Sequence, residues 1–331
     1  MIQSLKMEKN SKIYVTGCEG LVGSAVVREL QKQGYTDILR SSRTRLYHDG
    51  FYYDGNFDLR YEENVKNIFI RYNPQYIINA AGTVGGINAN NTRSAEFIRD
   101  NIMTQMNIIN MSYVYSVKKL LFLGSSCIYP KYCSQPIKEE YLLTSQLEET
   151  NIGYAIAKIS GLIMCRMFNK QYGSNFISVI PTNLYGPSDN FDLMNSHVVP
   201  AIIRKFYDAK LKDDRSVEFW GTGSARREFL YVDDLAEALV FLMNNYEDYK
   251  EHINVGTGED IMIKELVQLI KEIVDYDGKI FWNADYPDGT PVKRLDVTKI
   301  NNLGWKAKTS LRDGLKLTYK WFVENYENIR K

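Results

Sequence analysis

Apolar and polar positions along the first half of the chain form two alternating kinds of segment. Short runs that are almost wholly apolar predict buried strands, and longer stretches with apolar residues every three or four positions predict helices. The predicted strands are 12–16, 37–39, 76–80, 120–123 and 176–180, and the predicted helices are 21–33, 62–72, 94–114 and 154–172. Strands and helices that alternate in this way predict a parallel sheet with helices on both faces.

The second half has a less regular pattern, in which longer loops separate the elements. It contains predicted strands at 217–220 and 229–232 and predicted helices at 233–245, 264–274 and 311–325. We therefore predict an α/β fold, a doubly wound parallel sheet with a smaller C-terminal α/β lobe. The predicted boundaries are 1–181 for the large domain, with a segment near 229–258 returning to it, and 182–331 for most of the smaller lobe.

A glycine-rich segment, Gly17-Cys-Glu-Gly20-Leu-Val-Gly23, follows the first predicted strand and opens the first predicted helix. Glycines allow a tight turn and a close approach of the backbone to a diphosphate, and the helix N-terminus offers free N–H groups. A glycine motif alone is weak evidence, because an ordinary strand–helix turn can have the same composition. Its place at the chain start favours dinucleotide binding, with contacts from Gly17, Gly20, Leu21, Val22 and Gly23.

The region after the second predicted strand indicates which dinucleotide is bound. NAD sites usually place an acid here for the ribose 2′-hydroxyl, whereas residues 39–45 contain arginines and no acid. Arg40 and Arg43 suit the 2′-phosphate of NADP(H), and a solvated basic loop is the alternative interpretation. Asp58 and Leu59, further along the chain, are weaker candidates for adenine contacts.

Three side chains predict the reduction of a carbonyl group. Tyr154 and Lys158 lie four positions apart on a predicted helix, so they share one face. We expect the Lys158 ammonium to lower the pKa of the Tyr154 phenol, which can then donate a proton to a ketone oxygen. Ser125 follows the predicted strand 120–123 and can bond the same oxygen. A surface pair is the alternative, since the chain has 24 tyrosines, but the order of the glycine loop, serine, tyrosine and lysine favours a catalytic site.

This order resembles the extended short-chain dehydrogenases/reductases that act on nucleotide sugars, and within them the GDP-L-fucose synthase family. The matching stretches run through almost the whole chain: 84–90, 120–130, 154–158, 181–187, 195–200, 227–234, 252–258 and 287–291. The resemblance implies a Rossmann-like sheet, NADP(H) as cofactor and a homodimer formed through the two long helices. It also implies that NADPH is used to reduce the 4-keto group of a GDP-linked 4-keto-6-deoxy sugar.

The resemblance assigns a second catalytic pair, Cys127 and His197, which would epimerise carbons 3 and 5 of the sugar before reduction. Protons beside a ketone are acidic because the enolate places its charge on oxygen. A thiolate can remove such a proton, and an acid on the other face can return it. Without the resemblance, a buried cysteine and an ordinary histidine are the better interpretations. Substrate pose decides whether the two residues reach these protons.

The resemblance maps further residues to the two ligand sites. The cofactor residues it adds are Ala80, Ala81, Gly82, Asn101, Pro181, Asn183, Leu184 and His197, beside Tyr154 and Lys158. The substrate residues are Ser126, Cys127, Asn183, Val198, Lys205, Trp220, Arg227, Asp288 and Lys293. Among them, Arg227 can hold a phosphate through two hydrogen bonds, while Lys205 and Lys293 act as point charges.

Two positions depart from the family pattern. Glu19 stands in the glycine loop where a basic residue is expected, and an acid there opposes a 2′-phosphate. Gly82-Thr83 replaces an expected Ala-Lys pair near the sugar, which leaves room for a longer sugar such as a 6-deoxy-heptose. Three alternatives stay open: a reductase of an already epimerised hexose or heptose, a nucleotide-sugar 4-epimerase with tightly bound NAD, and a non-catalytic dinucleotide sensor.

Composition limits the remaining classes of partner and location. The formal net charge of the 331 residues is +1, which favours neither nucleic acid nor an anionic membrane. The four cysteines form no CxxC pair, so neither a metal site nor a disulfide framework is predicted. No apolar run suggests a signal peptide or approaches the ~20 residues of a membrane span. We therefore expect a cytoplasmic protein.

Overall fold

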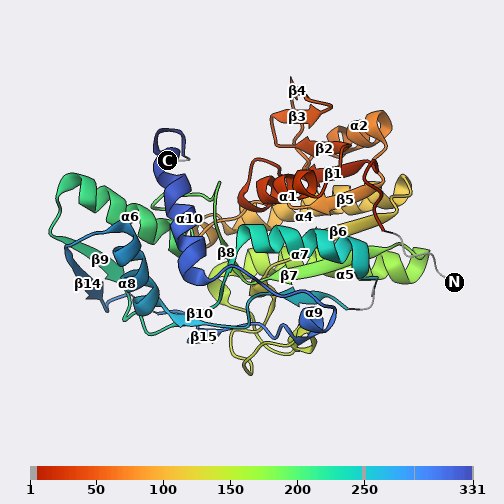
Figure 1. The fold of residues 1–331 in the computed structure, drawn as a ribbon. Coiled ribbons are helices and arrows are strands. Elements are labelled where there is room, and N and C mark those ends of the chain that lie inside the picture. Colours follow the sequence, from red (N-terminus) through yellow and green to blue (C-terminus); the bar gives the residue numbers. More distant parts are fainter. Residues whose placement is uncertain (1–5, 248–250, 287, 330–331) are drawn as a thin grey trace.

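The computed structural model describes residues 6–247, 251–286 and 288–329. Residues 248–250 of the segment expected to return to the large domain lie outside these ranges, as does Pro287, which begins the family-like stretch 287–291. Figure 1 shows a layered α/β body next to a smaller lobe of helices and short strands.

The central sheet confirms the predicted α/β class. Its strands lie in the order β12-β7-β6-β5-β1-β2-β3-β4, and those from β12 to β2 pair in parallel. The parallel strands are β1 Ile13–Thr16, β2 Ile38–Ser41, β5 Tyr76–Asn79, β6 Lys119–Leu123, β7 Phe176–Pro181 and β12 Ile253–Val255. Most of them read as continuous apolar runs because helices bury both faces of the sheet. The strand expected at 37–39 lies at 38–41 instead.

Helices cover both faces of this sheet (Figure 1). On one face α1 packs against α7, and on the other α4 packs against α2 and α5. These helices are α1 Leu21–Lys32, α2 Glu62–Tyr72, α4 Ser94–Val114, α5 Ile152–Tyr172 and α7 Val232–Asn245. The helices expected at 62–72 and 94–114 have these bounds, and α5 begins two residues before the predicted 154. No helix within the described ranges is both long and apolar enough to cross a membrane.

The sequence pattern does not predict the edge of the sheet beyond β2. There β3 Arg45–His48 and β4 Phe51–Asp54 form an antiparallel hairpin. Asp49 and Gly50 have φ of 52° and 78°, as the two central residues of a tight hairpin turn require. The period-two signal is weak because Leu46 is the one buried residue in the two strands. The Asp-Gly pair was the available signal for this hairpin.

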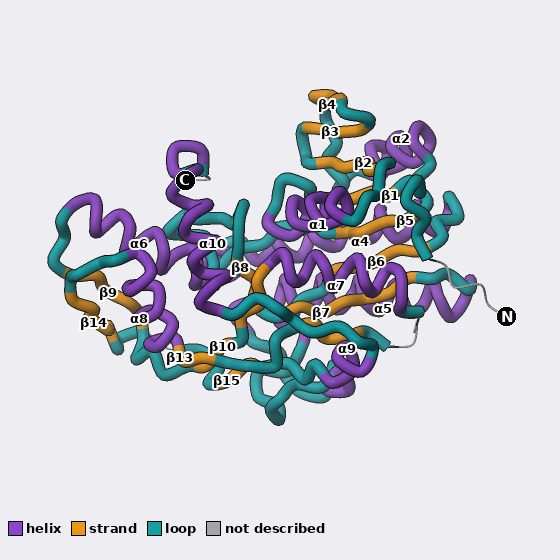
Figure 2. The backbone as a smooth tube through the Cα atoms, in the orientation of Figure 1, coloured by secondary structure: helices purple, strands orange, loops and turns teal. Residues whose placement is uncertain are grey.

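The C-terminal lobe has its own apolar core, which includes Phe206, Leu266 and Phe322. Around it lie α6 Val198–Lys212, α8 Ile263–Val274, α10 Leu311–Glu324 and the parallel pair β9 Ser216–Trp220 and β14 Lys279–Asn283. Short strands connect the lobe to the sheet domain (Figure 2): β8 Asn183–Tyr185 with β11 Phe229–Tyr231, and β13 Ile261–Met262 with β10 Arg226–Arg227 and β15 Val292–Lys293. The remaining short helices are α3 Ile87–Thr92 and α9 Thr298–Asn302.

Candidate active site

The glycine loop leaves the space at the start of α1 that a diphosphate needs. Gly17 has φ +65°, and a Cβ there would lie 3.0 Å from the Ala81 Cα. A Cβ at Gly23 would overlap the carbonyl of Gly17, so a side chain at either position would displace the backbone. Gly20 is the N-cap of α1, whose first turn holds no acid. Free N–H groups of a helix start, in a loop without side chains, fit an anionic diphosphate.

Residues 80–82, which follow β5, lie against the glycine loop, and we name this segment the cofactor floor. A Cβ at Gly82 would lie 3.1 Å from Asn101 Oδ1 and 3.6 Å from Lys158 Nζ, so these two side chains flank it. Asn101 is buried, and its amide bonds the backbone of Thr83 in both directions, at 3.0 Å and 2.9 Å. Asn101 therefore fixes the path of the backbone between Ala81 and Thr83.

The side chains of the predicted adenosine end all contact other residues of the chain. Arg43 donates to the Thr83 hydroxyl at 3.1 Å, and Arg40 lies over a tyrosine ring of the neighbouring strand. The Asp58 carboxylate instead accepts from Arg60, which also bonds Asp100 on α4 at 2.8 Å. Asp58 thus holds the segment before α2, and its contact with adenine stays a prediction.

Ser125, Tyr154 and Lys158 come together at the carboxyl end of β6. Lys158 Nζ donates to the carbonyl of Leu123 at 2.8 Å and lies 5.8 Å from the centre of the Tyr154 ring. The Ser125 hydroxyl lies close enough to the Tyr154 phenol to lower its pKa, and it accepts from the N–H of Cys127 at 3.4 Å. This is the end of the sheet at which doubly wound folds bind ligands.

The expected lowering of the Tyr154 pKa by Lys158 is wrong in this structure. Burial raises the pKa of Tyr154, the nearby Cys127 thiol raises it further, and the Ser125 hydroxyl lowers it. The Lys158 ammonium is directed at the Leu123 carbonyl, and burial lowers the pKa of Lys158 to about 8. Tyr154 is therefore protonated at neutral pH, which is the form that a proton donor needs.

Cys127 lies inside the same cluster. Burial raises the pKa of its thiol, while Lys293, Ser125 and Lys158 lower it. Burial outweighs the two ammonium groups, so the pKa of the thiol lies above its ordinary value and the protonated form prevails at neutral pH.

His197 is the N-cap of α6 and its side chain is open to solvent. Although the side chain is accessible to solvent, many protein atoms lie around the imidazole, and this partial desolvation lowers its pKa. The segment before it packs on the Val84-Gly-Gly loop, because the Gly86 N–H donates to the carbonyl of Asn195 at 2.8 Å. A Cβ at Gly86 would overlap the Ser196 carbonyl, so this close approach requires glycine. The structure therefore joins the start of α6 to the loop that follows the cofactor floor.

Two cations on neighbouring strands face the catalytic cluster. Arg227 on β10 pairs in register with Lys293 on β15. Burial lowers the pKa of both. Asp288 favours charged Arg227, and Cys127 favours charged Lys293, whose pKa Arg227 lowers further. Two partly desolvated cations side by side are suited to an anion such as a diphosphate.

The other predicted substrate residues lie further into the lobe. Lys205 donates to the Glu218 carbonyl at 3.0 Å and lies 6.0 Å from the Trp220 ring centre. Trp220 is 59% exposed and stacks on Tyr286 at 4.4 Å, a partner that the sequence reasoning missed. The Asp288 carboxylate accepts from Thr222 at 2.7 Å, which lowers its pKa.

Glu228 is a further residue that the sequence reasoning missed. Its fully buried carboxylate accepts from the N–H groups of Thr257, Gly258 and Leu295 at 2.6 Å, 2.8 Å and 2.8 Å. Glu228 follows Arg227 directly, and Leu295 lies two positions after Lys293. The carboxylate therefore connects the strands that carry both cations to the loop after β12. In the sequence, the one feature that could have indicated Glu228 is its position directly after Arg227 in the family-like stretch 227–234. The carbonyl of Glu228 also accepts from Asn183 at 2.8 Å.

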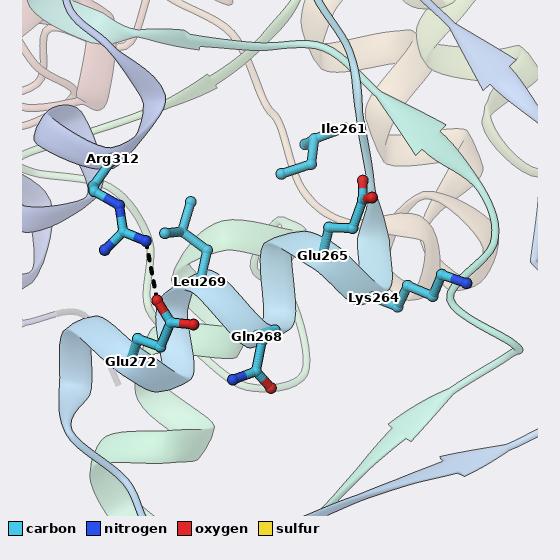
Figure 3. Close-up of a pocket in the computed structure, with 7 residues that line it drawn as sticks. All are labelled: Ile261, Lys264, Glu265, Gln268, Leu269, Glu272 and Arg312. Carbon is cyan, nitrogen blue, oxygen red and sulfur yellow. Dashed lines mark hydrogen bonds and ion pairs between the residues drawn. The ribbon is translucent and has the colours of Figure 1, made fainter.

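A groove between α8 and α10 lies apart from this cluster (Figure 3). It is lined by residues of both helices, and the ion pair of Glu272 with Arg312 at 3.0 Å spans it. None of the predicted site residues lines it. The groove is open and lacks the buried polar groups of the cluster at β6, so we place the active site at β6.

Comparison with known proteins identifies the family of the chain. The model of the NAD dependent epimerase/dehydratase family matches residues 13–256. GDP-L-fucose synthase 1 of Arabidopsis thaliana is 50% identical over 321 residues, which cover 97% of this chain and 96% of that protein.

Solved structures resemble the chain over its full length. A GDP-6-OMe-4-keto-L-xylo-heptose reductase from Campylobacter jejuni is 37% identical with a TM-score of 0.89, covering 97% of this chain and 99% of the other. A GDP-mannoheptose C4 reductase from the same organism, with NADP bound, is 38% identical with a TM-score of 0.85, covering 96% and 99%. The chain therefore belongs to the NAD dependent epimerase/dehydratase family and, within it, to the GDP-L-fucose synthase family.

Proposed function

We propose that the protein reduces the 4-keto group of a GDP-4-keto-6-deoxy sugar with NADPH and epimerises carbons 3 and 5 beforehand. The observation that carries this proposal is a single cluster of Ser125, Tyr154 and Lys158 with Cys127 and the cation Lys293. The relatives support it, because they are GDP-L-fucose synthases and GDP-heptose reductases along nearly the whole chain. The chain is accordingly an NADP(H)-dependent oxidoreductase of GDP-sugars.

The described residues fit NADP(H). Gly17, Gly20 and Gly23 leave the cradle for its diphosphate, and Arg40 and Arg43 are the cations for its 2′-phosphate. When bound, NADPH supplies the hydride for carbon 4. Lys158 lies next to Gly82 on the cofactor floor, where its ammonium can bond the nicotinamide ribose.

Tyr154 acts as the proton donor of the reduction. Burial keeps the phenol protonated, so it can give its proton to the ketone oxygen as that oxygen gains charge. Ser125 lies beside the phenol and can donate to the same oxygen, which orients the ketone. An O–H group placed before the reaction needs no reorganisation as the charge develops.

Cys127 and His197 carry the epimerisation in this proposal. Cys127 removes the proton beside the ketone, with Lys158 and Lys293 favouring its thiolate. Burial lowers the pKa of His197, so the imidazole is mostly neutral near pH 7 and must take up a proton before it returns one to the sugar. Arg227 and Lys293 bind the diphosphate of the GDP moiety, and Trp220 with Tyr286 offers a stacked apolar surface.

A reductase without epimerase activity is the second candidate. Two solved structures similar to this chain are heptose C4 reductases. Thr83, which stands where a lysine is expected, is held by Asn101 and Arg43 and brings no amine to the sugar. This favours a sugar longer than a hexose. If the protein were a 4-epimerase, it should purify with stoichiometric bound NAD. A non-catalytic sensor would not need the buried Tyr154 and Lys158.

Product analysis tests the two candidates together. GDP-4-keto-6-deoxy-mannose and the corresponding heptose are each incubated with protein and NADPH in deuterated water, and products are identified by mass spectrometry and NMR. We expect reduction at carbon 4 with deuterium at carbons 3 and 5. The variant Cys127→Ser should reduce without incorporating deuterium. Wild-type reduction without deuterium would establish the reductase-only candidate, and absence of NADPH oxidation with either sugar would contradict both.

We also propose that the protein is a cytoplasmic homodimer assembled through α4 and α5. The two helices pack together and leave exposed apolar side chains, among them Met106, Tyr113, Ile156 and Met167. Free thiols at all four cysteines suit a reducing compartment. In light scattering, the double variant Ile156→Glu, Met167→Glu should be a monomer, whereas Leu211→Glu, at an exposed apolar residue of α6, should leave the dimer intact. A wild-type monomer would contradict this assembly.

A further inference from the structure

The glycine loop places an acid beside the arginines that suit the 2′-phosphate of NADP(H). The Cys18 N–H donates to the carbonyl of Ser41 at 3.0 Å, so the loop lies against the end of β2. Glu19 follows Cys18 directly. A carboxylate that faces a phosphate repels it, so a chain that uses NADP(H) needs a means of offsetting this charge.

The β3–β4 hairpin supplies two groups that hold the Glu19 carboxylate. The Tyr47 hydroxyl donates to Glu19 Oε1 at 2.7 Å, and Arg45 Nη1 lies 3.7 Å from the same oxygen. Arg45 also donates to Asp54 across the hairpin at 3.3 Å, which restricts the direction of its guanidinium. The carboxylate is thus drawn toward β3.

The backbone of β3 directs both groups to the loop. Arg45 and Tyr47 are two residues apart, so they lie on the same face of the strand, while Leu46 between them is fully buried on the other face. Tyr47 pairs with Arg40 of β2, whose guanidinium lies 4.9 Å from the centre of its ring. A slip of one residue would expose Leu46, so its burial fixes the register that aims Arg45 and Tyr47 at Glu19.

We propose that the β3–β4 hairpin is a cofactor-selectivity element, in which Arg45 partly neutralises Glu19 and Tyr47 holds it away from the 2′-phosphate. Arg40 and Arg43 then remain as the cations for that phosphate. The inference deepens the proposed function and rests on it only in taking NADP(H) as the cofactor.

The charges and exposure of these groups set the size of the expected effect. Glu19 without its partners offsets one of the two positive charges of Arg40 and Arg43. Arg45 reduces this effect only in part, because its guanidinium also pairs with Asp54. The side chains of Arg45 and Glu19 are 51% and 38% exposed, so water screens the pair. A screened interaction of this kind changes affinity for the phosphate by about tenfold or less.

Equilibrium binding of NADPH, NADH and 2′,5′-ADP to the full chain tests the proposal without requiring turnover. Arg45→Met should weaken NADPH and 2′,5′-ADP by about threefold to fivefold and leave NADH unchanged, because only the first two carry the phosphate. Tyr47→Phe should give a smaller loss in the same direction. Adding Glu19→Gln to either variant should restore the affinity for NADPH, since the charge to be neutralised is gone.

A matched control removes a cation elsewhere on the hairpin side. Arg71 lies 5.5 Å from the ring of Tyr53 on the outer strand, and Arg71→Met should change none of the three affinities. Equal losses for NADPH and NADH in the β3 variants would overturn the proposal. It is overturned as well if Glu19→Gln fails to reverse the loss in Arg45→Met, since Arg45 then binds the phosphate itself. Failure of sugar reduction with this binding pattern intact would count against the proposed reaction alone.

Discussion

At the scale of single residues, burial rather than pairwise charge decides the protonation of the catalytic groups. Tyr154 and Lys158 stand one helical turn apart, yet burial raises the pKa of the first and lowers that of the second to about 8. Both shifts favour the neutral form, as desolvation does for any ionisable group. The site therefore holds a protonated phenol beside an amine whose charge depends on pH near neutrality.

The pKa of Lys158 predicts an alkaline limit for the free enzyme. The ammonium is charged below about pH 8 and loses its proton above it. We therefore expect kcat/KM for the sugar to decline as the pH rises through about 8, because a neutral amine binds the cofactor ribose less well.

The variant Lys158→Arg separates this group from others, since a guanidinium stays charged throughout that range. Its kcat/KM should be lower than that of the wild type but should lack the decline near pH 8. A decline that is unchanged in Lys158→Arg would assign the titration to another group.

At the scale of elements, the strands that carry the substrate cations depend on one buried carboxylate. Glu228 bonds the N–H groups of Thr257, Gly258 and Leu295, which belong to segments far apart in the sequence. Arg227 and Lys293 lie next to these bonds on β10 and β15. The pairing of β10 with β15 sets the separation of the two cations, and the Glu228 carboxylate anchors both strands to the loop after β12.

We expect that replacing the Glu228 carboxylate lowers both the stability of the protein and its affinity for the substrate. In Glu228→Gln, one oxygen acceptor becomes an N–H₂ donor that faces backbone donors, so we expect the free energy of unfolding to fall by ~1–3 kcal/mol. The KM for the sugar should rise more than kcat falls. Urea denaturation and steady-state kinetics measure the two effects. The control Glu63→Gln, at an exposed residue of α2, should change neither. Unaltered stability in Glu228→Gln would contradict the role of this residue.

The sequence predicts helices better than it predicts edges and side-chain networks. The helix at 62–72 was located because Val65, Ile68 and Phe69 recur at helical spacing and are buried together. The helix at 94–114 was also located, although many of its buried residues are polar. The β3–β4 hairpin escaped prediction because most of its residues are exposed and show no period-two burial. Tyr154 and Lys158 could be paired from their spacing, whereas their pKa values depend on how the whole domain covers them. The partners of Glu228 are distant in sequence, so no local pattern could indicate them.

At the scale of the whole molecule, two bodies with separate cores contribute to one site. The sheet domain supplies Ser125, Cys127, Tyr154 and Lys158 at the end of β6, and the C-terminal half supplies Lys293. Lys293 and Cys127 lie close enough to influence each other's ionisation. The proposed catalytic groups and the cation Lys293 therefore meet where the bodies join, a place where enzymes commonly bind their ligands.

The central claim is that Tyr154 gives the proton that completes reduction at carbon 4. The most direct test compares single-turnover reduction by the wild type and by Tyr154→Phe, with NADPH affinity measured on both proteins. We predict that the variant binds NADPH within about twofold of the wild type and reduces the 4-keto sugar at least about 10²-fold more slowly. Reduction at the wild-type rate by a variant that binds NADPH normally would contradict the account.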